Sequence, residues 1–139
     1  MSHTLYAENI LEHYRHPHRK GALASPTVTH EEVNASCGDR ITLQLTIKEG
    51  KVKDAGWEGN GCAISQASMS LLSEELIGMT EDELGNAGPG MIRELLGIDV
   101  GPQRIKCALL PLHALKNALR KMKGRPPQGW RETLGDGTA

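Results

Sequence analysis

The three cysteines of this 139-residue chain, Cys37, Cys62 and Cys107, are the residues best suited to chemistry. Their odd number excludes a complete internal disulfide framework. Cys37 and Cys62 stand beside glycines, where backbone amides can approach a sulfur atom or a ligand closely. Asp39, two residues after Cys37, adds a carboxylate oxygen. Three thiolates and one carboxylate together form a set of four ligands for a tetrahedral metal ion or an iron–sulfur cluster.

Two other interpretations of the cysteines remain open from the residues alone. Each cysteine could be a small buried apolar residue, and this holds most for Cys107, which Ala108 and Leu109 follow. A catalytic thiol would need a histidine base, but no histidine is adjacent to a cysteine, and His113 lies six positions beyond Cys107. The separations of 25 and 45 positions also differ from the close ligand pairs of zinc fingers. Folding must therefore bring the cysteines together.

Length and composition indicate one globular domain with an aliphatic core. We expect residues 1–123 to form this domain and residues 124–139 to form a C-terminal tail. The chain has no Phe, two Trp and two Tyr, so aliphatic side chains must fill the core. A formal net charge of −1 and short apolar runs give no reason to expect nucleic acid or a membrane as a partner. The N-terminus lacks the layout of a signal peptide, so we expect a cytoplasmic protein whose thiols stay reduced.

The pattern of apolar residues predicts an α+β fold with a three-stranded antiparallel sheet and about five helices. The clearest strand is residues 40–48, in which Ile41, Leu43, Leu45 and Ile47 alternate with polar residues. The turn Glu49-Gly50 joins it to a returning strand. The predicted strands are residues 27–35, 40–48 and 51–58. The predicted helices cover residues 4–15, 65–77, a short segment opened by a capping box at Thr80, 89–96, and a long amphipathic segment between 105 and 122.

These elements place each cysteine at an element boundary. Cys37 falls in the connection before the clearest strand, and Cys62 follows the last strand. Pro111 lacks the amide that would bond to the carbonyl of Cys107, so the last helix must begin close to Cys107 or kink there. A helix start and the neighbouring Lys106 both favour a thiolate at Cys107. Loops at one end of an α+β layer can meet, which makes a shared site plausible.

Several polar segments outside the cysteines allow two interpretations each. The His-rich segment 13–21 could bind metal, but a basic helix end that complements the helix dipole explains it better. The stretch 101–131 carries eight Lys or Arg residues and no acid, which fits a solvated helix face or a surface for an acidic partner. Trp130 could pin the tail to the domain or mark a partner contact.

The sequence resembles the U-type iron–sulfur cluster scaffold family, which comprises IscU, SufU and the N-terminal domain of NifU. The resemblance runs from about residue 5 to residue 122. The matching segments are Glu12-His13-Tyr14-Arg15-His16-Pro17, Asn34-Ala35-Ser36-Cys37-Gly38-Asp39, Gly59-Asn60-Gly61-Cys62-Ala63-Ile64-Ser65 and Arg104-Ile105-Lys106-Cys107-Ala108-Leu109.

The resemblance implies a SufE/NifU-like fold with Cys37, Asp39, Cys62 and Cys107 gathered at one exposed end as the metal and cluster ligands. It also implies a scaffold or carrier rather than a turnover enzyme. Such a protein accepts sulfur from a cysteine desulfurase, assembles a transient [2Fe–2S] cluster and transfers it to acceptor or carrier proteins. Family members also bind zinc at these positions, so Zn²⁺ is expected in the purified protein.

Two departures from the IscU pattern concern the third cysteine. Lys106 precedes Cys107 where IscU has a histidine, a feature shared with SufU. The segment 98–103 replaces the Leu-Pro-Pro-Val-Lys motif that a dedicated chaperone reads, so that chaperone is not expected as a partner. The insertion typical of SufU between the second and third cysteines is also absent, which places the chain between the two subgroups.

The ligand set suggests how a cluster could be held and then released. A carboxylate is a weaker partner than a thiolate for a sulfide-bridged cluster, so Asp39 should loosen the hold. Cys107, Cys37 and Cys62 are the candidate persulfide acceptors, with Cys107 slightly favoured by the resemblance. Because three sulfurs and one oxygen also suit zinc, a zinc-containing sulfurtransferase is the alternative function and a structural zinc protein is a third.

Overall fold

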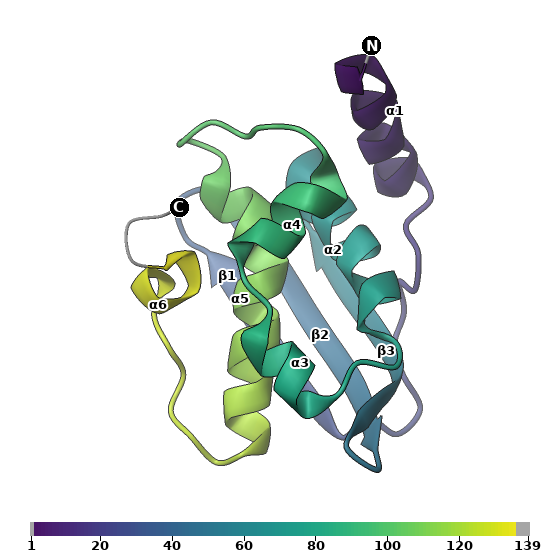
Figure 1. Cartoon of the computed structure of the whole chain (residues 1–139), viewed down its shortest axis with the longest axis vertical. Helices are drawn as coiled ribbons and strands as arrows, with labels where there is room; N and C mark the ends of the chain where they lie inside the picture. The colour runs from purple at the N-terminus through teal and green to yellow at the C-terminus, as the bar shows by residue number, and fades with distance from the viewer. Residues whose placement is uncertain (1, 136–139) are drawn as a thin grey trace.

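The structure, a computed structural model, describes residues 2–135, with side chains from residue 7 onward. Met1 and the last four residues of the expected tail, 136–139, lie outside the described residues. Within residues 2–135, nine elements follow one another, and Figure 1 shows how they are arranged. They are α1 (Ser2–Arg15), β1 (Val28–Asn34), β2 (Asp39–Lys48), β3 (Lys51–Asn60), α2 (Ala63–Leu76), α3 (Glu81–Asn86), α4 (Pro89–Leu96), α5 (Ile105–Met122) and α6 (Trp130–Leu134).

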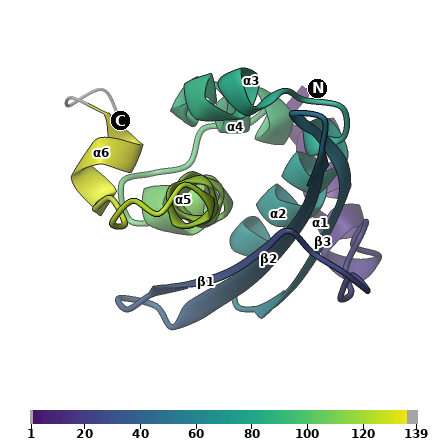
Figure 2. The ribbon, with the colours of Figure 1, turned by 90° about the horizontal axis from the view of Figure 1, so that it is seen from below.

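The three strands form one antiparallel sheet in the order β1-β2-β3. The alternation predicted for β2 decides which face is buried, because Ile41, Leu43 and Leu45 are fully buried on one side. Figure 2 shows this curved sheet with α5 lying in its concave face and α2 beside β3. Both helices pack directly on the strands. The predicted α+β fold and antiparallel sheet are therefore confirmed.

Aliphatic side chains fill the space between the sheet and the helices, as the composition predicted. Trp57 is the largest of the fully buried side chains, and its indole Nε1 donates a hydrogen bond of 2.8 Å to the His18 carbonyl. The other fully buried large side chains come from β2 and the helices: Ile41, Leu43, Leu45, Met69, Leu72, Leu76, Leu84, Ile92, Leu96, Leu109 and Leu110. This core fixes the ends of β2, α2 and α5 relative to one another.

Local signals in the sequence set most of the helix boundaries. Thr80 and Glu83 form the predicted capping box, and Pro89 and Gly97 open and close α4. The prediction for α2 was wrong at its start, because the helix begins at Ala63 and Ser65 already belongs to its first turn. None of the helices among residues 2–135 is long and apolar enough to cross a bilayer.

The tail contains a sixth helix that the sequence did not predict. After α5 ends, the chain turns back, and the short helix α6 lies beside α5 (Figures 1 and 2). Trp130 opens α6 and stacks on the ring of His113 in α5, with ring centroids 4.1 Å apart and an interplanar angle of 18°. Of the two interpretations of Trp130, this contact supports the one in which Trp130 pins the tail to the domain.

Candidate metal centre

Cys37 lies in the tight turn that joins β1 to β2. The amides of Cys37 and Gly38 both donate to the carbonyl of Asn34, at 3.2 and 2.7 Å, which closes the turn. Gly38 has a φ of +78°, in the left-handed region that favours glycine. The turn leaves Cys37 exposed to solvent. Cys37 is therefore the thiol that a second protein can reach most directly.

Asp39 points into the site because it shares the buried face of β2. It stands two residues before Ile41, and side chains two apart in a strand point to the same side. Its carboxylate Oδ1 accepts a hydrogen bond of 3.1 Å from the Cys62 amide, and its Oδ2 accepts one of 3.3 Å from the Cys62 thiol. Only 3% of Asp39 remains exposed.

Cys62 is the N-cap residue of α2 and is placed there by a glycine. Gly61 has a φ of +145°, and a Cβ at this position would collide with the Asp39 carboxylate, lying 2.6 Å from its Cγ. Gly61 thus lets β3 turn directly into α2 while the carboxylate lies against the backbone. As a result, Cys62 and Asp39 meet although they come from different elements.

Cys107 lies in the first turn of α5, as Pro111 predicted. Its Sγ is 3.4 Å from the Cys37 Sγ, and the side-chain amide of Asn34 approaches it at 4.0 Å. Asn34 is itself buried, and its Oδ1 accepts the Ser36 amide at 3.2 Å. The sequence analysis gave Asn34 no role, although an Asn at the end of a strand often organises the following turn through its side chain.

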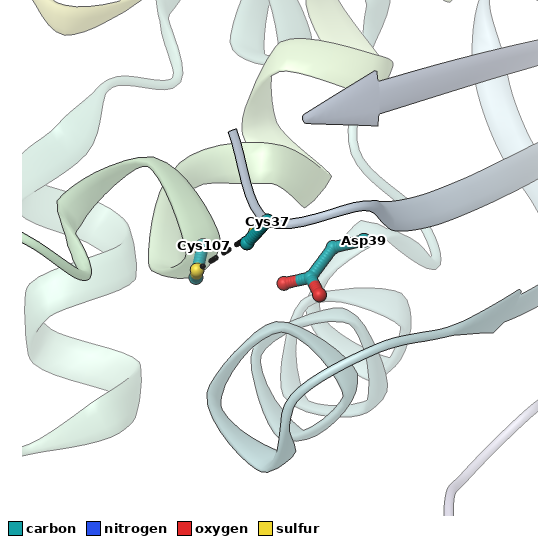
Figure 3. A group of neighbouring side chains, drawn as sticks. All are labelled: Cys37, Asp39 and Cys107. Carbon is teal, nitrogen blue, oxygen red and sulfur yellow. Dashed lines mark hydrogen bonds between the residues drawn. The ribbon is translucent and has the colours of Figure 1, made fainter. Parts of the chain in front are cut away.

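The four predicted ligands converge at one end of the sheet. Figure 3 shows Cys37, Asp39 and Cys107 facing a common point, and one ligand atom from each lies within 4.8 Å of the others. The Cys62 sulfur does not belong to that mutual group, but its contact with Asp39 joins it to the cluster. All four residues that the sequence singled out are thus neighbours.

Two of the observed separations are close to those of tetrahedral coordination, although the Cys62 sulfur is not within 4.8 Å of all the other ligand atoms. Zn–S bonds of about 2.3 Å at tetrahedral angles place two sulfurs ~3.8 Å apart, and a Zn–O bond of about 2.0 Å places sulfur and oxygen ~3.5 Å apart. The Cys37–Cys107 distance of 3.4 Å and the Cys62–Asp39 distance of 3.3 Å are both close to these values. A disulfide would need sulfurs about 2.05 Å apart, so these thiols are unbridged.

The local environment has opposite effects on the acidities of Asp39 and Cys107. Burial alone would raise the pKa of Asp39, but the hydrogen bonds from Cys62 outweigh it and the pKa is lowered overall. Burial, followed by the neighbouring Cys37, raises the pKa of Cys107. The helix start and Lys106, which were expected to favour a thiolate at Cys107, are outweighed by burial in the metal-free site.

The histidines of the segment 13–21 do not belong to a group of described side chains that could share a metal ion. Among the residues whose side chains are described, 7–135, the only group of three or more His, Cys, Asp or Glu close enough to share an ion is Cys37, Asp39 and Cys107. His13 instead pairs with Ser70 through its Nδ1 at 2.7 Å, and His18 lies 3.4 Å from Glu74. These contacts fasten the last turns of α1 and the segment after it to α2.

The chain is similar to several known proteins. Residues 5–128 match the family model described as the NifU-like N-terminal domain. The chain is 39% identical to the iron–sulfur cluster assembly scaffold protein IscU of Thermotoga maritima, over 85% of this chain and 94% of that protein. It is 34% identical to the zinc-dependent sulfurtransferase SufU of Bacillus subtilis, over 87% and 93% of the two chains.

A solved structure gives the same result for the fold. The N-terminal part of a NifU-like protein from Brucella abortus superposes with a TM-score of 0.71 and 26% identity, over 87% of this chain and 96% of that one. The family model covers most of the chain and includes all four clustered residues. The chain therefore belongs to the NifU-like N-terminal domain family.

Proposed function

We propose that this chain is an iron–sulfur cluster assembly scaffold. It receives sulfur from a cysteine desulfurase, assembles a [2Fe–2S] cluster on Cys37, Asp39, Cys62 and Cys107, and passes the cluster to acceptor proteins. The observation that carries the proposal is the meeting of three thiols and one carboxylate from separate elements at one end of the sheet. The relatives named as scaffold proteins support it. A cytoplasmic location, where thiols stay reduced, fits this function.

The residues of the site suggest different roles in accepting sulfur and in releasing the cluster. Exposed Cys37 is the thiol that a desulfurase persulfide can reach first, and its sulfur then lies beside that of Cys107. Cys107 and Cys62 remain candidate acceptors for later sulfur. Asp39 supplies a harder ligand than a thiolate, which favours release of the cluster.

Anaerobic reconstitution tests the proposal. The protein is incubated with ferrous iron, cysteine, a cysteine desulfurase and a thiol reductant that supplies the electrons for sulfide formation. Optical and Mössbauer spectra should show a [2Fe–2S] cluster, and the variants Cys37→Ser, Cys62→Ser and Cys107→Ser should each lose it. Ser36→Ala is a matched control, because it neighbours Cys37 and contributes no proposed ligand. A parent protein that incorporates no sulfide would contradict the scaffold function.

Zinc-dependent sulfur transfer is the second candidate function, and a specific observation favours it. Two ligand separations, Cys37–Cys107 and Cys62–Asp39, are close to those expected around a zinc ion, and the relative from Bacillus subtilis is named a zinc-dependent sulfurtransferase. In that case zinc-loaded protein should stimulate the desulfurase and accept labelled sulfur as a persulfide without forming a cluster. Labelled sulfide bound together with iron indicates a scaffold, whereas labelled persulfide on a zinc protein indicates a sulfurtransferase.

A further inference from the structure

The C-terminal segment 126–134 runs back along α5 toward the metal centre. Arg120 donates from Nε to the Pro126 carbonyl at 2.5 Å, near the end of α5. One turn earlier, the side-chain amide of Asn117 exchanges two hydrogen bonds with the backbone of Gln128, of 2.7 and 3.2 Å. Figure 1 shows this return, in which the yellow end of the chain rises beside α5. The segment is therefore fastened antiparallel to the helix that begins at the centre.

Two contacts hold α6 beside the first half of α5. The Nδ1 atom of buried His113 lies 2.6 Å from the Thr133 hydroxyl, and Gln128 donates to the same hydroxyl at 2.9 Å. Because the Thr133 oxygen accepts from Gln128, its own proton is free to bond to His113. The stack of Trp130 on His113 completes this attachment. The position of the indole is thus determined by α5 itself.

The other contact of Trp130 lies next to the centre. The Lys106 ammonium is 5.7 Å from the centre of the Trp130 ring, within the range of a cation–π interaction. Lys106 makes no ion pair in the part of the chain whose side chains are described. It directly precedes Cys107, so the indole restrains a cation that is adjacent in sequence to a proposed ligand.

A restrained cation matters here because the loaded centre is anionic. Three thiolates and one carboxylate around Zn²⁺ give a formal charge of about −2. Binding changes the site from about −1, with one carboxylate and three neutral thiols, to about −2. For this change of one unit, a positive charge at an assumed separation of about 10 Å favours binding about twofold at the dielectric constant of water and about fifteenfold at an effective value of 20. A lysine that moves freely in water should change metal binding by close to the smaller, twofold factor. A lysine held against an aromatic ring should change it by more than this factor.

We propose that Trp130 is a positioning residue for the metal centre. It holds the Lys106 ammonium beside the first turn of α5. Through this lysine, the C-terminal segment affects the affinity of the centre for metal. This inference rests on the proposed function, because it requires that Cys37, Asp39, Cys62 and Cys107 bind a metal ion. Trp130 touches neither the metal nor its ligands, and it acts through Lys106 alone.

A double-mutant cycle tests the inference. The dissociation constant for Zn²⁺ is measured by competition with a chromophoric chelator for the full-length parent, Trp130→Leu, Lys106→Met and the double variant. Trp130→Leu should weaken binding about two- to tenfold at low salt. The effect should shrink at high salt and vanish in the Lys106→Met background. Trp130→Tyr, which keeps an aromatic face, should restore most of the affinity.

Thr133→Val is the matched control for a loosened α6. It removes the hydrogen bond to His113 but keeps the indole, so its affinity for Zn²⁺ should stay near that of the parent. A Trp130→Leu variant that binds like the parent would overturn the inference. So would a Thr133→Val variant as weak as Trp130→Leu, or a Trp130→Leu effect that persists without Lys106. If the parent itself binds no Zn²⁺, the proposed metal centre is refuted. Failure of the metal centre is thereby distinguished from failure of the inference on Trp130 alone.

Discussion

Replacing Gly61 by alanine should damage the metal centre through a single added methyl group. The φ of +145° at this position is strained for any residue with a Cβ, at a cost of about 1–3 kcal/mol. The new Cβ would also overlap the carboxylate of Asp39, which must then rotate away from Cys62. Losing hydrogen bonds to a charged acceptor costs about 1.5–3 kcal/mol more. We therefore expect both a lower stability and a displaced ligand.

Two measurements on Gly61→Ala separate these effects. Urea unfolding of the metal-free protein should show a loss of about 2.5–6 kcal/mol. Competition with a chelator should show the affinity for Zn²⁺ reduced at least about tenfold. Losses of this size are typical when the groups that orient a metal ligand are removed. Gly124→Ala is the control, because Gly124 also has positive φ, +71°, but its Cβ would meet open space at the far end of α5. It should lose stability and keep its Zn²⁺ affinity. Parental affinity and stability in Gly61→Ala would refute the reasoning.

Three further predictions follow from the site and the core. Asp39→Ala should slow transfer of the cluster to an acceptor protein, since a weak ligand is removed; a shorter transfer half-time than that of the parent would contradict this. Burial lowers the pKa of His13, so folding disfavours its protonation and stability should fall as pH drops below about 6.5. His13→Gln should flatten this part of a plot of unfolding free energy against pH, and an unchanged slope would exclude the role. Leu109→Ala should cost about 2–5 kcal/mol in thermal or urea unfolding, because Leu109 is fully buried in the core, whereas a loss below about 1 kcal/mol would indicate that the core closes around the cavity.

Much of the fold follows from short-range signals. The alternation of Ile41, Leu43 and Leu45 specifies one buried face of β2, and the structure has the predicted face. Thr80 with Glu83 marks a helix start through two reciprocal hydrogen bonds, which need only four consecutive residues. Such features depend on neighbours in the chain, so a sequence reveals them directly.

The features that escaped prediction depend on tertiary contacts. Helix α6 has five residues and is too short to be stable alone, and it is held by the stack of Trp130 on His113. The raised pKa of Cys107 results from burial beneath the β1–β2 turn, which outweighs the local effect of a helix start. Convergence of the cysteines could be expected from their places at element boundaries. Their pairing, Cys37 with Cys107 and Cys62 with Asp39, required the structure.

The position of Asp39 on the buried face of β2 also limits how this gene can change. Side chains alternate along a strand, so inserting or deleting one codon between Asp39 and Ile41 would place the acid on the opposite side from the apolar residues. A deletion would remove Arg40 and leave a solvent-facing acid directly before Ile41, whereas an insertion after Arg40 would turn this positive side chain to the buried face in place of the carboxylate. Evolution can therefore lengthen or shorten the distant loops of this protein far more freely than the two-residue interval that connects its acid to its core.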